Sequence, residues 1–256
     1  MKYGRADLHV HTRFSYDGLS TVEEVVDFAE FETDLDILAI TDHNKITGAL
    51  KARDYAKRQG YRIKIVIGEE IITSAGEVIA LFIDKQIPAH MSLKKTLKAI
   101  HLQKGLAVIP HPFYRINFNV LGSRLGFKLN LGLGGMNMRP IAKMLLSQDP
   151  TLAIHALETM NSSWHGRIPH RKVNRVNNRS TRLAQLGSSD AHRADFIGTS
   201  YTLFPGESVN DLYNAILSRE TIAKGEFWRN SDTVKLFAAN LKKHGRKFNP
   251  KLSAKR

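Results

Sequence analysis

The chain has 256 residues, of which 42% are hydrophobic and 24% are charged, with a net charge of +14. This composition is typical of a globular protein and excludes extensive disorder. The absence of cysteine excludes disulfides, thiolate metal sites and cysteine nucleophiles. No apolar run approaches the roughly 20 residues that cross a bilayer, and the first residues do not resemble a secretory signal. We therefore expect a cytoplasmic protein with no membrane partner.

The positive charge is concentrated in three tracts. Residues 115–148, 159–189 and 233–256 contain 19 of the 38 basic residues and no acidic residue, whereas the rest of the chain is mildly acidic. Such asymmetry indicates an anionic partner or substrate, although a charged face also serves solubility alone.

Short apolar runs alternate with amphipathic ones along the chain. Helical patterns cover residues 20–32, where Ser20 is a candidate N-cap, then residues 45–58, 92–104 and 208–217, the last with Ser208 as cap and Asp211 three positions later. The predicted strands are residues 37–41, 63–67, 78–83, 106–109 and 153–157. This alternation predicts an α/β fold with a parallel sheet, either open or closed into a barrel.

Two segments depart from this rhythm. Residues 117–137 are rich in Gly, Asn and Leu but contain no phosphate-binding glycine motif, so we expect an insertion there. The basic end of the chain contains Gly, Asn and Pro and is expected to fray. We therefore expect one domain over residues 1–232, interrupted at about 117–137, and a basic tail over residues 233–256.

Histidines and carboxylates recur near the ends of the predicted strands. His9 and His11 in DLHVHT share one face, because alternate residues of a strand do. The other candidates are Asp17 in SYDG, His43 in TDHN, Glu69 and Glu70 in GEEI, His111 in PHPF, Glu158, and Asp190 and His192 in GSSDAH. A single histidine in such a place is more often structural, but α/β folds build active sites at the carboxyl ends of their strands. Nitrogen and oxygen donors in this number suit two or three Zn, Mn or Fe ions.

In this order, the motifs resemble those of the PHP (polymerase and histidinol phosphatase) family, from Asp7 to about Leu217. The resemblance implies a distorted (β/α)7 TIM-like barrel, a trinuclear metal site and phosphate ester hydrolysis. It implies a first ion held by His9, His11, Glu70 and Asp190, a second held by Asp17, His43 and His192, and a third held by Glu70, His111 and Glu158. All of these ligands except Glu158 are also the expected catalytic residues. Glu69 is expected to be a neighbour of the site, and Ile79 stands where some relatives have a histidine.

The expected mechanism is in-line attack on phosphorus by a metal-bound hydroxide, with the ions stabilising the non-bridging oxygens. The expected substrate-binding residues are Arg115, Lys45, Asn161 and Arg167, with His165, His170 and Arg171 near the mouth and Trp164 as a candidate for base stacking. Basic tracts that follow the ligands favour a polyanionic substrate, namely a nucleotide, a bisphosphate or an oligonucleotide end.

Three alternatives stay open. The first is a nucleic-acid-binding protein with a non-catalytic metal site, which the basic tail favours. The second is a small-metabolite phosphatase of the histidinol-phosphatase type. A metal-dependent amidohydrolase is weaker, because the lysine-centred two-metal pattern of those barrels is not recognisable in the chain.

Overall fold

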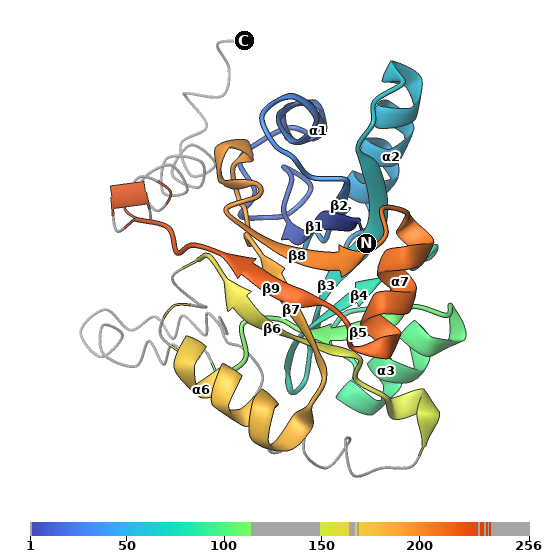
Figure 1. The fold of residues 1–256 in the computed structure, drawn as a ribbon. Helices are drawn as coiled ribbons and strands as arrows, with labels where there is room; N and C mark the ends of the chain where they lie inside the picture. The colour runs from blue at the N-terminus through green and yellow to red at the C-terminus, as the bar shows by residue number, and fades with distance from the viewer. Residues whose placement is uncertain are drawn as a thin grey trace, which may run out of the picture.

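The computed structural model describes residues 2–113, 149–163, 167, 169–229, 231, 232, 234 and 236. The expected insertion at 117–137 lies outside these residues, and so do Arg115, Trp164 and His165. Of the basic tail, only Val234 and Leu236 are described. The described residues form one sheet surrounded by helices (Figure 1).

The strands of the described residues make a sheet in the order β7-β6-β5-β4-β3-β2-β1-β8-β9. They are β1 (Tyr3–Val10), β2 (Ile37–Ile40), β3 (Lys64–Thr73), β4 (Gly76–Leu81), β5 (Leu106–Ile109), β6 (Ala156–Asn161), β7 (Ala184–Ser188), β8 (Ser200–Pro205) and β9 (Ile222–Gly225). β7 also lies against β8 and β9, so the two ends of the sheet meet and the barrel is nearly closed (Figure 1). The expected barrel-like α/β fold is confirmed.

The seam between β7 and β8 depends on Gly187. A Cβ atom there would lie 2.3 Å from the carbonyl oxygen of Tyr201 and 2.8 Å from that of Lys224. The Gly187 N–H donates to the Thr202 hydroxyl at 3.0 Å, and this hydroxyl donates to the Gly187 carbonyl at 2.9 Å. Because the residue has no side chain, β7 can approach both neighbouring strands and the barrel can close.

The sheet is mixed rather than parallel. β1, β2 and β3 are parallel, as are β5, β6 and β7, but β4 is antiparallel to both neighbours and β8 is antiparallel to β1 and β9. The predicted parallel sheet is therefore wrong at these strands. Only Ser74 and Ala75 separate β3 from β4, and so short a turn can join only antiparallel strands.

The predicted helices are present. They are α1 (Val22–Phe31), α2 (Thr47–Gln59), α3 (Leu93–Leu102) and α7 (Val209–Ser218), and a further helix, α6 (His170–Val176), was not predicted. The cap of α1 is Thr21 rather than Ser20, because Thr21 and Glu24 form a reciprocal capping box. Ser208 and Asp211 cap α7 as predicted. Among the described residues, no helix combines the length and apolar character that a membrane crossing requires.

Two apolar clusters cover the faces of the sheet. On β2, Leu38 belongs to the first cluster, together with residues of α1, α2 and α3, whereas Ala39 belongs to the second, with residues of α7. Val66 of the second cluster and Glu70 are four residues apart on β3 and therefore share a face. The second cluster thus underlies the polar site described next.

Candidate metal centre

A β-bulge aims the first two histidines. Leu8 belongs to the second apolar cluster but Val10 belongs to the first, and the register of β1 against β2 shifts between Asp7 and Val10. The alternation of side chains between the two faces of β1 is therefore interrupted after Leu8. As a result, His9 and His11 both point to the face that carries the site. Bulges commonly re-aim side chains beside active sites in this way.

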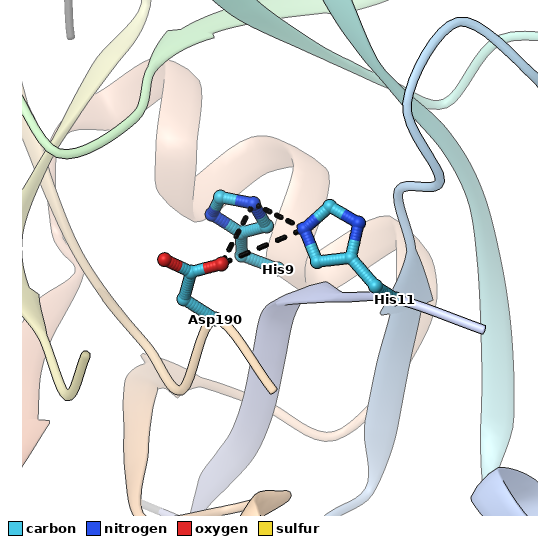
Figure 2. A group of neighbouring side chains, drawn as sticks. All are labelled: His9, His11 and Asp190. Atoms are coloured by element: carbon cyan, nitrogen blue, oxygen red, sulfur yellow. Dashed lines mark hydrogen bonds and ion pairs between the residues drawn. The ribbon is translucent and has the colours of Figure 1, made fainter. Parts of the chain in front are cut away.

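The four residues expected around the first ion converge. His9 Nε2 lies 3.0 Å from His11 Nε2, 3.1 Å from Glu70 Oε2 and 3.4 Å from Asp190 Oδ1. His11 Nε2 lies 3.4 Å from Glu70 Oε2 and 3.5 Å from Asp190 Oδ1. Figure 2 shows the two imidazoles and the Asp190 carboxylate facing one another. All four side chains are buried, so the geometry brings together the predicted first ligand set.

The second expected set lies beside the first. Asp17 Oδ2 is 3.3 Å from His43 Nε2 and 3.0 Å from His192 Nε2. The rings of His11 and His192 stack with their centroids 4.4 Å apart, which joins the two sets. The side chains of Asp17 and His192 are 17% and 10% exposed, whereas that of His9 is 0% exposed. Solvent therefore reaches the cluster from the side of the second set.

Glu70 connects the groups through its two oxygens. Its Oε2 faces His9 and His11, and also lies 3.4 Å from His43 Nδ1, while its Oε1 lies 3.1 Å from His111 Nε2. A carboxylate with a different histidine group at each oxygen suits a bridging ligand. Within the described residues, four overlapping groups could each hold an ion: His9–His11–Asp190, His9–Glu70–His111, His11–Asp17–His192 and His11–His43–Glu70.

Glu158 was expected to hold the third ion with Glu70 and His111, but its carboxylate oxygens accept hydrogen bonds from other groups. Its Oε1 accepts a hydrogen bond from His9 Nδ1 at 2.8 Å, and its Oε2 accepts from the backbone N–H of His111 at 2.8 Å and from Asn161 Nδ2 at 2.9 Å. A proton on Nδ1 leaves the lone pair of His9 on Nε2, which faces the cluster. Carboxylates behind metal-binding histidines commonly orient them in this manner.

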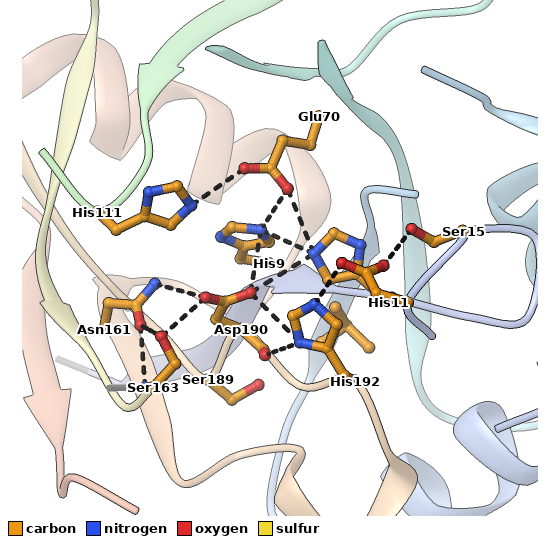
Figure 3. Close-up of polar contacts among 12 residues, drawn as sticks. His9, His11, Ser15, Glu70, His111, Asn161, Ser163, Ser189, Asp190 and His192 are labelled. Carbon is orange, nitrogen blue, oxygen red and sulfur yellow. Dashed lines mark hydrogen bonds and ion pairs between the residues drawn. The ribbon is translucent and has the colours of Figure 1, made fainter. Parts of the chain in front are cut away.

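Asp190 is held from its opposite side. The register of β6 against β7 shifts between Glu158 and Met160, which turns Asn161 toward the site. Asn161 Nδ2 and Ser163 Oγ lie 3.4 Å and 2.9 Å from Asp190 Oδ2. Figure 3 shows Asp190 with Asn161 and Ser163 on one side and His11 and His192 on the other. This arrangement directs Oδ1 of Asp190 toward the histidines.

At His43, Glu70 and Asp17, burial and the neighbouring charges shift the pKa in opposite directions, whereas at His11 they act together. Burial alone lowers the pKa of His43, but the Glu70 and Asp17 carboxylates outweigh it and raise this pKa to about 10. Burial likewise raises the pKa of Glu70 and of Asp17, yet nearby imidazoles hold both well below the usual range. Burial and the neighbouring His192 lower the pKa of His11 to about 4. The site thus keeps ionised carboxylates and stabilises positive charge among them.

These donors fit divalent metal ions. His9 Nε2 and His11 Nε2 face each other at 3.0 Å between two carboxylates, and a cation between them satisfies all four groups. His192 Nδ1 donates to the Asp190 carbonyl at 2.8 Å, which leaves the lone pair of Nε2, 3.0 Å from Asp17 Oδ2, free to bind a metal ion. An all-nitrogen and oxygen set suits Zn, Mn or Fe.

The expected substrate-binding residues differ in exposure and in their distance from the cluster of carboxylates. Lys45 is exposed just before α2, and Arg167 is exposed with its guanidinium 5.9 Å from the ring centroid of Phe227. Asn161 is buried among the carboxylates, where it orients them. Arg115 lies outside the described residues.

The sequence interpretation missed several residues near the cluster, among them Ser15, whose hydroxyl donates to Asp17 Oδ1 at 2.6 Å. The others are Ser163, which contacts Asp190, Tyr16, whose ring stacks on that of His43 with the centroids 4.7 Å apart, and Glu77 of β4, whose Oε2 is 3.9 Å from His111 Nε2. The signal for Glu77 was present: a hairpin turn at Ser74 and Ala75 places it on the same sheet face as Glu70. The sequence interpretation took residues 78–83 as a parallel strand and therefore did not place Glu77 beside Glu70.

Known proteins resemble this chain in sequence and in fold. The family model of the PHP domain matches residues 7–117, and that described as PHP-associated matches residues 170–221. An uncharacterised protein of Methanocaldococcus jannaschii is 38% identical over 136 residues, which cover 50% of this chain and 77% of the relative.

Two solved structures illustrate the likeness in fold. A two-domain protein of Bacteroides vulgatus, containing a predicted PHP-like metal-dependent phosphoesterase, matches with a TM-score of 0.65 and 19% identity over 93% of this chain and 70% of its own. Endonuclease Q, in complex with a duplex substrate with an abasic lesion at the active site, matches with a TM-score of 0.51 and 11% identity over 85% of this chain and 57% of its own.

Proposed function

Because the chain belongs to the PHP domain family, we propose that it is a metal-dependent phosphoesterase whose buried cluster holds two or three divalent ions. One observation carries the proposal. The expected catalytic side chains come from segments far apart in the sequence and converge on one site, and they are His9, His11, Asp17, His43, Glu70, His111, Asp190 and His192. Such convergence is costly without a shared ligand, because it takes many ionisable groups out of water together.

The bound ions and the side chains of the site have separate roles in the proposed reaction. When bound, divalent ions activate water and stabilise the charge on phosphoryl oxygens. Three such ions would bring more positive charge than the negative charge on the five carboxylates of the cluster, so the loaded site attracts an anionic phosphate ester; these carboxylates are Asp17, Glu70, Glu77, Glu158 and Asp190. Glu158 keeps the His9 proton on Nδ1, and Asn161 holds Glu158 in place.

The surroundings of the site favour a polyanionic substrate. Arg171, Lys172 and Arg175 are exposed on α6, and Lys172 Nζ lies 4.2 Å from the ring centroid of Phe113, two residues after His111. This contact ties the basic helix to the segment that carries a proposed ligand. The fold likeness to endonuclease Q, whose structure contains a duplex substrate with an abasic lesion, also supports a nucleotide, a bisphosphate or an oligonucleotide end as substrate.

The test is a screen of the full chain loaded with Mn²⁺ or Zn²⁺. Substrates are mononucleotides, nucleoside bisphosphates, sugar phosphates, histidinol phosphate and short oligonucleotides with 5′ or 3′ phosphates, and the readouts are released phosphate and strand cleavage. We expect Asp190→Asn to lose more than about 100-fold in activity, and Asp34→Asn, a change of an exposed carboxylate, to retain it. Turnover that survives in Asp190→Asn, or no turnover by the loaded protein, contradicts the proposal.

The same screen separates the alternatives. A nucleic-acid-binding protein with a non-catalytic metal site would bind the oligonucleotides, with affinity falling steeply as salt rises, and would release no product. A small-metabolite phosphatase would hydrolyse histidinol phosphate or a sugar phosphate in preference to the oligonucleotides. The basic face of α6 makes us expect the reverse preference.

A further inference from the structure

Tyr16 ends a stack of aromatic rings that runs along one side of the cluster. The ring centroids of His192 and His11 are 4.4 Å apart, those of His11 and His43 are 4.9 Å apart, and those of His43 and Tyr16 are 4.7 Å apart. The angles between successive planes are 23°, 28° and 20°, so the rings lie nearly parallel. The three imidazoles belong to proposed metal ligands, whereas the phenol ring of Tyr16 does not.

The outer face of this last ring is open. Tyr16 is 43% exposed, and among the described residues no other ring and no cation stacks on it. Since His43 covers one face, the exposed area belongs mainly to the other face and to the hydroxyl edge. A further planar group can therefore extend the stack in the same direction, at the spacing that aromatic pairs prefer.

A tight turn fixes the ring in this place. The Ser15 N–H donates to the Thr12 carbonyl at 3.0 Å. The Ser15 hydroxyl donates to Asp17 Oδ1 at 2.6 Å and accepts the N–H of His43 at 3.4 Å. A Cβ atom on Gly18 would lie 1.9 Å from the Thr12 carbonyl oxygen, so the turn needs glycine there. Because the ring is held before any ligand arrives, stacking on it loses little conformational freedom.

Tyr16 also stands at the entrance to the cluster. It directly precedes Asp17, and the side chains of Asp17 and His192 are the partly exposed ones, at 17% and 10%. A phosphate that reaches the proposed ions from this side passes the phenol ring. The rest of the substrate then extends over that ring.

We propose that the open face of Tyr16 stacks the base of the nucleotide whose phosphate is hydrolysed, which makes Tyr16 a specificity-determining residue. The inference rests on the proposed function, in that the substrate phosphate is taken to bind at the ions. The base becomes the next ring of the stack, and the sugar spans from Tyr16 to the cluster. Every base has a face that stacks on an aromatic ring, so Tyr16 selects nucleotides and oligonucleotide ends over sugar phosphates without selecting one base.

The experiment compares AMP with ribose 5-phosphate, which lacks the base, as substrates of the Mn²⁺-loaded full chain. We expect Tyr16→Leu to lower the ratio of kcat/KM for AMP to kcat/KM for ribose 5-phosphate by about tenfold, through KM, because base–aromatic stacking is lost. Tyr16→Phe and Tyr16→Trp retain an aromatic ring and should keep the ratio of the wild type.

Tyr3 supplies the matched control. It is 48% exposed, close to the value for Tyr16, but it is the first residue of β1, whereas His9 lies near the other end of that strand. Tyr3→Leu therefore removes an exposed tyrosine far from the cluster. It should leave the ratio and both kcat/KM values unchanged.

Two results would overturn the inference and leave the proposed function standing. The first is an equal loss on both substrates in Tyr16→Leu, which would mean that the ring only supports His43. The second is an unchanged ratio in that variant.

Binding separates the inference from the proposed function. The probes are the analogues of AMP and ribose 5-phosphate in which a CH2 group replaces the ester oxygen, and the measurement is titration calorimetry of the Mn²⁺-loaded chain. Tyr16→Leu should weaken binding of the AMP analogue alone, by about tenfold. This result in a protein that hydrolyses no phosphate ester would refute the proposed function and leave the stacking site intact, whereas equal binding by wild type and variant would overturn the inference.

Discussion

Gly48→Ala tests how the scaffold positions two ligand segments. Gly48 lies in the first turn of α2, where a Cβ atom would stand 1.9 Å from Asp42 Oδ2 and 2.7 Å from Thr12 Oγ1. The Asp42 carboxylate accepts the Thr12 N–H at 2.6 Å and the Thr12 hydroxyl at 2.7 Å. Because Thr12 follows His11 and Asp42 precedes His43, this clamp joins the two histidine-bearing segments.

The expected magnitude follows from three opposing effects. Replacing glycine by alanine in a helix normally stabilises it by about 1 kcal/mol. Here the added methyl group displaces Asp42, and each lost hydrogen bond to that carboxylate costs about 1.5–3 kcal/mol. Overpacking itself costs about 1–3 kcal/mol. We therefore expect Gly48→Ala to lower the free energy of unfolding by about 3 kcal/mol, or Tm by roughly 6–12 °C.

The assay is urea unfolding of the metal-free chain, followed by Mn²⁺ titration of the folded variant. Metal affinity should fall together with stability, since His11 and His43 lose their relative placement. Lys57→Ala, an exposed change on the same helix, should alter stability by less than about 0.5 kcal/mol. The reasoning is refuted if Gly48→Ala is more stable than the wild type, as an unhindered helical glycine would predict.

Three further outcomes are expected. Burial and the nearby His101 lower the pKa of His155 to about 4. Its contribution to the free energy of unfolding is therefore complete above pH 6.5 and is lost as the pH falls toward 4, by up to about 3 kcal/mol. Unfolding of His155→Asn should depend less on pH over this window, and an unchanged dependence would contradict the assignment. Leu97→Ala, which empties a fully buried position of α3, should cost about 2–5 kcal/mol in chemical unfolding, and a change below 1 kcal/mol would contradict the packing. Asn161→Ala should weaken Mn²⁺ binding by about 10–100-fold in calorimetry, because it removes the hydrogen bonds that hold the carboxylates of Glu158 and Asp190 in place. Unaltered binding would show that the Asn161 amide does not orient these carboxylates.

Local patterns predicted much of this protein correctly. The apolar runs located β2 and β5, and the Ser208 and Asp211 pair located the start of α7. The His-x-His spacing predicted a shared face for His9 and His11, which the structure confirms. These features depend on neighbours in the chain, so their physical causes are contained in short stretches of sequence.

The pairing of strands was harder to predict from the sequence. The run at residues 78–83 was recognised as a strand but not as the second arm of a hairpin, because its direction depends on the two-residue turn before it. The shifts of register in β1 and β6 were also not predicted, since a bulge is a property of two paired strands. Each of these errors assigned side chains to the wrong face of the sheet or to the wrong neighbouring strand.

The sequence by itself determined the kinds of donor and their positions near strand ends, since these depend on residue identity and local periodicity. Only the tertiary structure decided which atom faces which. Glu158 bonds to His9 Nδ1, and Glu77 approaches His111, because barrel closure and two bulges set distances between segments far apart in the chain. Coordination depends on separations of a few ångströms, which packing alone establishes.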